Sequence, residues 1–175
     1  DIVELAMKEM EELELQTAHT VWLGVLSGPE VVVLKTSRGS QPIQFTVERG
    51  HRLPAHAAAM GKALLALKPD GEVRETLDNC LDARTTETLG SIDGLLSELA
   101  ITRLRGYAVS NQELFEGVKS VSVAFKDPHK HMAVAISVSY PLFVVQNTSD
   151  QPIIDALLMF ASSFGSRVGD LRWMR

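Results

Sequence analysis

Apolar residues recur at intervals of three or four at the beginning of the chain. The apolar positions are Ile2, Leu5, Ala6, Met10 and Leu13, and charged residues fill most of the positions between them. This spacing is typical of an amphipathic helix with one face against a core. We therefore expect the chain to begin with a helix, which either packs on the domain or leads to residues that precede it.

The pattern then changes to runs of β-branched residues. Residues 20–26 and 31–37 are such runs, and the turn sequence Ser27-Gly-Pro-Glu30 separates them. Runs of this kind flanking a short turn predict a β-hairpin. A third strand is expected over residues 43–48.

The remaining elements follow from helix formers, capping residues and further β-branched runs. Ser91 is a suitable N-cap and Gly106 a suitable C-terminal stop for one of the helices. The expected helices cover residues 57–67, 69–79, 91–104 and 155–165. The expected strands cover residues 107–111, 118–126 and 132–139.

The order of helix, strands, helices, strands and helix favours an α+β fold. Hairpins inside each group of strands predict a mainly antiparallel sheet rather than a doubly wound parallel one. A length of 175 residues with 45% hydrophobic content suffices for one packed core. We therefore expect a single domain over residues 1–175.

The last two expected strands each have one bulky and one small face. Alternation places valine, isoleucine, methionine and phenylalanine on one face, and alanine and serine on most of the other. The bulky face is expected to be core. The small face either meets water or lines a cavity, and a cavity better explains the choice of alanine and serine. Its serines are Ser120, Ser122, Ser137 and Ser139.

Composition narrows the classes of function. The net charge of -5 is opposite in sign to that of a surface that neutralises phosphates, so this chain alone is not expected to bind nucleic acid. Cys80 is the only cysteine, which rules out an internal disulfide. The apolar runs are too short to span a membrane, and no signal peptide is recognised. We expect a cytoplasmic protein, cut from a longer one because it begins with Asp1.

The segment Ala57-Ala-Ala-Met-Gly61 has two interpretations that the sequence leaves open. Small residues at a helix start let a ligand, best an anion, approach backbone N–H groups. They equally let the helix pack closely on the sheet. Lys62, which follows, is expected to be solvated or paired in a salt bridge.

No catalytic constellation is recognised. His56 has no nucleophile at a recognisable spacing, and neither nucleotide-binding nor nucleophile-elbow motifs occur. His129 and His131 lie in an expected turn, and with His51 they make only a weak metal signal. We expect no catalytic residue, no metal and no cofactor. The alternatives left open are a metal-dependent enzyme that processes small molecules and a purely structural oligomerisation module.

Several segments together resemble the effector-binding domain of the IclR family of bacterial transcription regulators. Their order and spacing agree over nearly the whole chain, so the combination is more specific than any one segment. The matching segments are Leu53-Pro-Ala-His56, Gly61-Lys-Ala-Leu-Leu-Ala66, Thr85-x-x-Thr88 before Leu95-Leu96, Arg105-Gly-Tyr107, Glu113, Gly117-Val118 and Ala135-Ile-Ser-Val-Ser139.

The resemblance implies a sensor domain with a GAF-like or PAS-like fold, in which a curved, mainly antiparallel sheet is flanked by helices. The implied ligand is a small organic, aromatic or sugar acid. The implied assembly is a homodimer or homotetramer, with operator DNA bound only by an N-terminal winged helix-turn-helix domain that this chain lacks.

The resemblance also implies which residues form the pocket. Helix-start N–H donors fall at Ala59, Met60 and Gly61. Polar side chains fall at Ser110, Ser120, Ser137 and Ser139, and apolar walls at Phe45, Leu53 and Val118.

Three of these positions depart from many relatives. Ser110 replaces an Asp, Ser120 replaces a Cys, and Met60 is bulkier than usual. A two- or three-carbon keto acid is therefore not the expected ligand.

Overall fold

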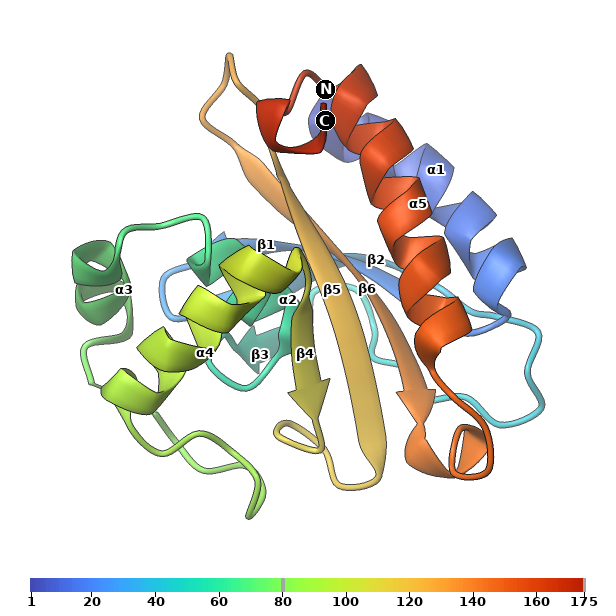
Figure 1. The fold of residues 1–175 in the computed structure, drawn as a ribbon, viewed down its shortest axis with the longest axis horizontal. Coiled ribbons are helices and arrows are strands. Elements are labelled where there is room, and N and C mark those ends of the chain that lie inside the picture. Colours follow the sequence, from blue (N-terminus) through green and yellow to red (C-terminus); the bar gives the residue numbers. More distant parts are fainter. Residues whose placement is uncertain (80, 175) are drawn as a thin grey trace.

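The computed structural model describes residues 1–79 and 81–174, and Cys80 lies outside them. In this part of the chain six strands form one antiparallel sheet in the order β3-β2-β1-β6-β5-β4 (Figure 1). The strands are β1 (Thr20–Ser27), β2 (Glu30–Ser37), β3 (Arg52–Pro54), β4 (Ala108–Asn111), β5 (Val118–Lys126) and β6 (Ala133–Pro141). The fold is α+β, as predicted.

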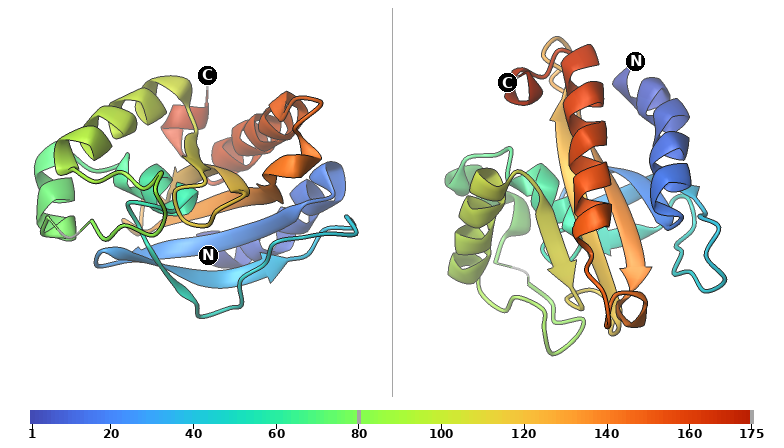
Figure 2. Two further views of the ribbon diagram at one scale, coloured as in Figure 1. Left: turned by 90° about the horizontal axis from the view of Figure 1, so that it is seen from below. Right: turned by 45° about the vertical axis from the view of Figure 1, so that its right-hand side comes forward.

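Helices cover both faces of this curved sheet (Figure 2). Helices α1 and α5 lie side by side on one face, and α2, α3 and α4 lie on the other (Figure 1). Each layer encloses a hydrophobic core of its own, with the sheet between them. The helices are α1 (Ile2–Thr17), α2 (Ala59–Leu65), α3 (Asp70–Leu77), α4 (Ile92–Arg105) and α5 (Gln151–Arg167), with 3₁₀ turns at Leu142–Val144 and Leu171–Trp173.

The two-faced character of β5 and β6 is confirmed. The bulky residues, among them Val121, Phe125 and Ile136, are buried in the core beneath α1 and α5. The small face lies toward α2 instead of toward water. Its four serines, Ser120, Ser122, Ser137 and Ser139, are all at most 9% exposed. The alternation therefore gives one sheet a densely packed side and a side with smaller side chains.

Several local predictions also hold. β1 and β2 form the expected hairpin, with a register shift between Leu23 and Gly24. The Ser91 side chain accepts a hydrogen bond from the backbone N–H of Gly94 and caps α4, whose C-cap is Gly106 with φ 89°. The first and last helices form as expected, although α5 begins at Gln151 rather than at 155.

The third strand expected over residues 43–48 is wrong. These residues form no strand, and the strand that pairs with β2 is Arg52–Pro54. Side chains instead donate hydrogen bonds to backbone carbonyl groups in this region. The Gln44 amide donates to the carbonyl oxygen of Gln41 at 2.9 Å, and the Thr36 hydroxyl donates to that of Val47 at 2.7 Å. Such side-chain hydrogen bonds compete with a strand ladder.

The helix expected over residues 57–67 is shorter in the structure. α2 covers Ala59–Leu65. It begins later than expected because the backbone N–H groups of Ala57 and Ala58 both donate to the carbonyl oxygen of Pro54 in a turn. A seven-residue helix has a weaker summed dipole than the longer helix that the sequence predicted.

Candidate functional site

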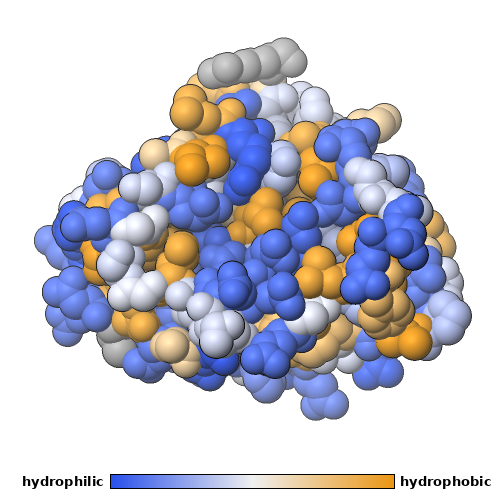
Figure 3. All heavy atoms as spheres, turned by 60° about the horizontal axis from the view of Figure 1, so that its bottom comes forward, coloured by the Kyte–Doolittle hydropathy of each residue, from blue (hydrophilic) through white to orange (hydrophobic). Residues whose placement is uncertain are grey.

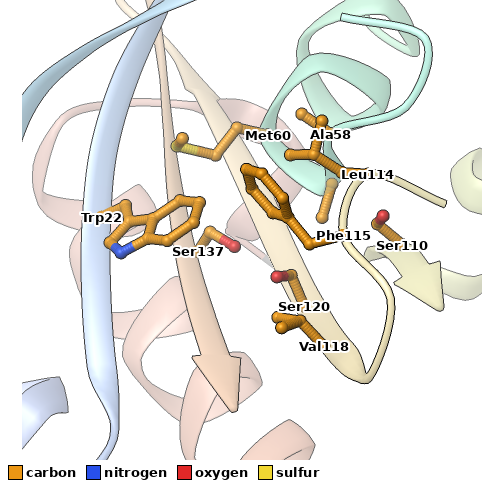
Figure 4. A pocket seen from close by; sticks show the side chains of 10 residues that line it. Trp22, Ala58, Met60, Ser110, Leu114, Phe115, Val118, Ser120 and Ser137 are labelled. Atoms are coloured by element: carbon orange, nitrogen blue, oxygen red, sulfur yellow. The ribbon is translucent and has the colours of Figure 1, made fainter. Parts of the chain in front are cut away.

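A small cavity lies between α2 and the serine face of the sheet (Figure 4). It is bounded by the beginning of α2, by β1, β5 and β6, and by the connection between β4 and β5. Its volume is about 10 Å³, room for roughly one water molecule. The lining residues are Trp22, Ala58, Ala59, Met60, Ser110, Leu114, Phe115, Val118, Ser120 and Ser137.

The serine hydroxyls of this wall are already engaged. Ser110 Oγ donates to the carbonyl oxygen of Ala57 at 2.6 Å, and Ser137 Oγ donates to that of Val121 at 3.1 Å. Their hydrogens are therefore in use, and these two oxygens can only accept from a ligand.

The hydroxyls of Ser120 and Ser139 lie 2.6 Å apart. Because one of the two donates to the other, the second hydrogen of this pair remains free to donate. The serine wall thus offers acceptors at Ser110 and Ser137 and one donor at the Ser120/Ser139 pair.

Aromatic side chains close the other side of the cavity. The ring of Phe115 lies across the group of lining side chains, with Trp22 and Met60 beyond it (Figure 4). Phe45 packs behind these rings, with its centroid 4.6 Å from that of Phe115 and 5.9 Å from that of Trp22. Tilted rings at such separations attract each other beyond simple burial. Phe45 and Phe115 form the aromatic cover of the cavity, and both come from connections between strands.

The structure brings six of the ten sequence-predicted site residues to the cavity wall. They are Ala59, Met60, Ser110, Val118, Ser120 and Ser137. The other four do not line it. Phe45 supports the aromatic cover, Ser139 pairs with Ser120, and Leu53 is buried in the core of this layer. Gly61 packs on Ala55, where a Cβ would lie 2.1 Å from the carbonyl oxygen.

Sequence reasoning missed Trp22, Ala58, Leu114 and Phe115 as lining residues. Trp22 could have been found, because it alternates with Thr20 and Gly24 on one face of β1 and pairs with Ser137. No periodic signal marks Leu114 or Phe115, since both lie in a connection.

Lys62 of α2 is the largest charged side chain buried on this side of the sheet. It is 1% exposed, and its Nζ lies 2.8 Å and 2.9 Å from the two carboxylate oxygens of Glu113. Glu98 Oε1 lies 3.8 Å from the same nitrogen and also pairs with Arg105 at 3.3 Å. Lys62 is therefore a buried salt-bridge residue, one of its two expected states.

His56 is buried and its Nε2 lies 2.9 Å from the carbonyl oxygen of Asp82. Burial lowers the pKa of its imidazole below the ordinary value. His51, His129 and His131 are all exposed. Over residues 1–79 and 81–174, no three His, Cys, Asp or Glu side chains come close enough to hold a metal ion. In the same ranges no helix has the length and apolar character needed to cross a membrane.

Comparison with known proteins identifies related chains. The transcriptional regulator KdgR of Dickeya chrysanthemi is 29% identical over 97% of this chain and 56% of its own length. The probable regulator ArcR of Halobacterium salinarum is 32% identical over 93% of this chain and 64% of its own. The chain thus spans between half and two thirds of these curated relatives, which are transcription regulators and not enzymes.

Solved structures show the same fold. The C-terminal domain of KdgR from Escherichia coli has a TM-score of 0.82 and 26% identity, covering 96% of this chain and 98% of that one. An IclR homolog from Microbacterium hydrocarbonoxydans, complexed with 4-hydroxybenzoate, has a TM-score of 0.79 and 25% identity, covering 98% and 68%.

The family model for the C-terminal region of the bacterial transcriptional regulator IclR matches residues 1–165, nearly the whole chain. Sequence motifs, fold and relatives agree on this point, and the chain belongs to the IclR family of transcription regulators.

Proposed function

We propose that this chain senses a small aromatic hydroxy acid, held in the cavity beside Ser120, and thereby controls DNA binding by a separate N-terminal domain. The observation that carries the proposal is the wall of the cavity, in which three serines face Trp22 and Phe115. Polar groups placed among aromatic ones are the usual composition of a small-molecule site.

The hydrogen-bonding inventory of the wall supports this ligand class. A carboxylate can accept from the free hydrogen of the Ser120/Ser139 pair, and from first-turn N–H groups of α2, whose N-cap Ala58 provides no side-chain cap. A ligand hydroxyl can donate to Ser110 or Ser137, whose oxygens can only accept. The aromatic cover favours a ring over a sugar acid. The related homolog complexed with 4-hydroxybenzoate supports the same class.

The size of the cavity implies how binding acts. A volume of about 10 Å³ is far too small for a benzoate ring, so Phe115 and Met60 must move when a ligand enters. A ligand then favours the open arrangement by its differential affinity for it. In a homodimer or homotetramer, that change would alter how the DNA-binding domains are held.

Other parts of the proposal follow from the family. A regulator that meets operator DNA works in the cytoplasm and needs no cofactor for sensing. The net charge of -5 supports DNA contact through the N-terminal domain only. On the face shown in Figure 3, apolar side chains form separate patches among polar ones, so that face alone does not designate a subunit interface.

Isothermal titration with benzoate, 4-hydroxybenzoate, galacturonate and pyruvate tests the proposal. We expect saturable binding, tightest for 4-hydroxybenzoate. Ser120→Ala should weaken it by roughly three- to tenfold, the usual effect of one lost neutral hydrogen bond.

Ser122→Ala is the matched control. Ser122 lies two residues further along the same face of β5, but it donates to the carbonyl oxygen of Ile136 and does not line this cavity. Equal losses in both variants, or no binding of any of the four acids, would overturn the proposal.

A further inference from the structure

The Lys62 side chain is 1% exposed, and its ammonium group lies within hydrogen-bonding distance of both carboxylate oxygens of Glu113. A buried charge is tolerated only when it is paired and hydrogen-bonded. The folded protein therefore keeps Lys62 and Glu113 together, and this contact joins α2 to the connection between β4 and β5.

The segment over residues 111–117 takes in the last residue of β4 and that connection, and further contacts hold it at Gln112 and Glu113. The Glu113 carboxylate accepts a hydrogen bond from the backbone N–H of Asn111 at 2.9 Å. The Thr88 hydroxyl donates to the carbonyl oxygen of Glu113, and the Thr85 hydroxyl donates to that of Gln112, both at 2.6 Å. The anchored residues come directly before Leu114 and Phe115, which reach the cavity.

The same ion pair also holds the opposite wall. Met60, which lines the cavity, lies two residues before Lys62 on α2, and Phe115 lies two residues after Glu113. The separation of Met60 from Phe115 thus depends on how closely Lys62 and Glu113 approach.

We propose that the buried Lys62–Glu113 ion pair is a positioning pair for the ligand cavity, which holds Phe115 against α2 and so limits the size of the ligand admitted. The inference rests on the proposed sensing function for its biological meaning. Its structural part concerns the cover of the cavity and is measurable without any ligand.

The double substitution Lys62→Met/Glu113→Gln tests the pair without leaving an unpaired buried charge. It is made in a Trp173→Phe background, so that Trp22 is the remaining tryptophan of the two in the chain. The probe is acrylamide, which quenches Trp22 only when the cover opens. We expect quenching to rise, and amide exchange over residues 111–117 to quicken by roughly tenfold, while α5 exchanges as before.

Lys35→Met/Glu11→Gln is the matched control. It removes an ion pair of the same 2.8 Å length, between α1 and β2. Neither quenching nor exchange in residues 111–117 should change in this variant. Thr88→Val is a second test, which removes one anchor of Glu113 but no charge. It should quicken exchange in the connection by a smaller factor.

The outcomes separate this inference from the proposed function. A folded double variant with unchanged quenching and exchange overturns the positioning pair. If that variant does not fold, unchanged exchange in Thr88→Val overturns it instead. If no acid binds but quenching and exchange still rise in the double variant, only the sensing function is overturned. Where benzoate binds, the double variant should gain affinity for 2-naphthoate relative to benzoate, and an unchanged ratio contradicts the size limit.

Discussion

At the scale of single residues, neighbouring positions at the start of α2 have two separate roles. Ala59 and Met60 line the cavity, whereas Gly61 faces the backbone of Ala55. Close packing, one of the two interpretations that the sequence left open, therefore applies at Gly61. The approach of a ligand to Ala59 and Met60 remains a proposal.

Gly61→Ala is expected to lower the free energy of unfolding. Its Cβ would lie 2.1 Å from the carbonyl oxygen and 2.3 Å from the Cα of Ala55, so the backbone must shift at a cost of about 1–3 kcal/mol. Gly71→Ala in α3 is the control, because nothing lies within 4 Å and helix propensity favours alanine there. Urea unfolding should give opposite signs for the two variants, and a neutral Gly61→Ala would contradict the packing role.

The residues of the site differ in how far the sequence predicts them. Ser120 and Ser137 are predictable because alternation in a strand fixes which face a side chain occupies. Phe115 is not, because its position depends on contacts of Glu113 with Lys62, 51 residues earlier. Pairing over such a distance leaves no local pattern in the chain.

At the scale of elements, α2 and the β4–β5 connection depend on each other through charge. Lys62→Met alone leaves Glu113 buried without its partner and is expected to cost about 3–5 kcal/mol. Lys62→Met/Glu113→Gln should recover most of that loss, since no buried charge remains unpaired on the connection. Denaturant unfolding of the two single variants and the double variant gives the coupling energy. Additive effects would show that the pair contributes nothing as a pair.

Elements defined by a regular pattern were predicted well, and elements defined by their neighbours were not. The strands β5 and β6 and the caps of α4 follow from local sequence. The segment over residues 43–48 has suitable β-formers, but the Thr36 side chain binds its backbone at Val47, and the Gln44 side chain binds the backbone of Gln41 just before it. Which partner a backbone group finds is decided by the tertiary fold.

At the scale of the whole molecule, two buried histidines, His19 and His56, make the stability of the fold depend on pH. His19 packs against Tyr140 with ring centroids 5.5 Å apart, and His56 contacts Asp82. Burial lowers both pKa values below 6.5 in the folded state. The folded protein therefore takes up these protons less readily than the unfolded chain.

Stability should consequently be full above about pH 6.5 and fall as the pH drops through the folded pKa values. His19→Phe keeps a ring against Tyr140 and should flatten this decline between pH 7 and pH 5, as measured by thermal unfolding. His129→Phe, at an exposed position, is the control. An unaltered slope in His19→Phe would contradict the role of His19.

The alternating faces of β5 have a mechanical consequence. Ser120 borders the cavity, and Val121, joined to it by one peptide bond, is packed in the core beneath α1 and α5. A close-packed core does not deform freely, so a ligand that displaces Ser120 also displaces Val121 and presses on the helices behind it. Only the single layer of the sheet separates the cavity from the core beneath α1 and α5. A preceding domain would be joined to α1. A signal from the cavity therefore needs no long relay of side chains to reach the far side of the domain.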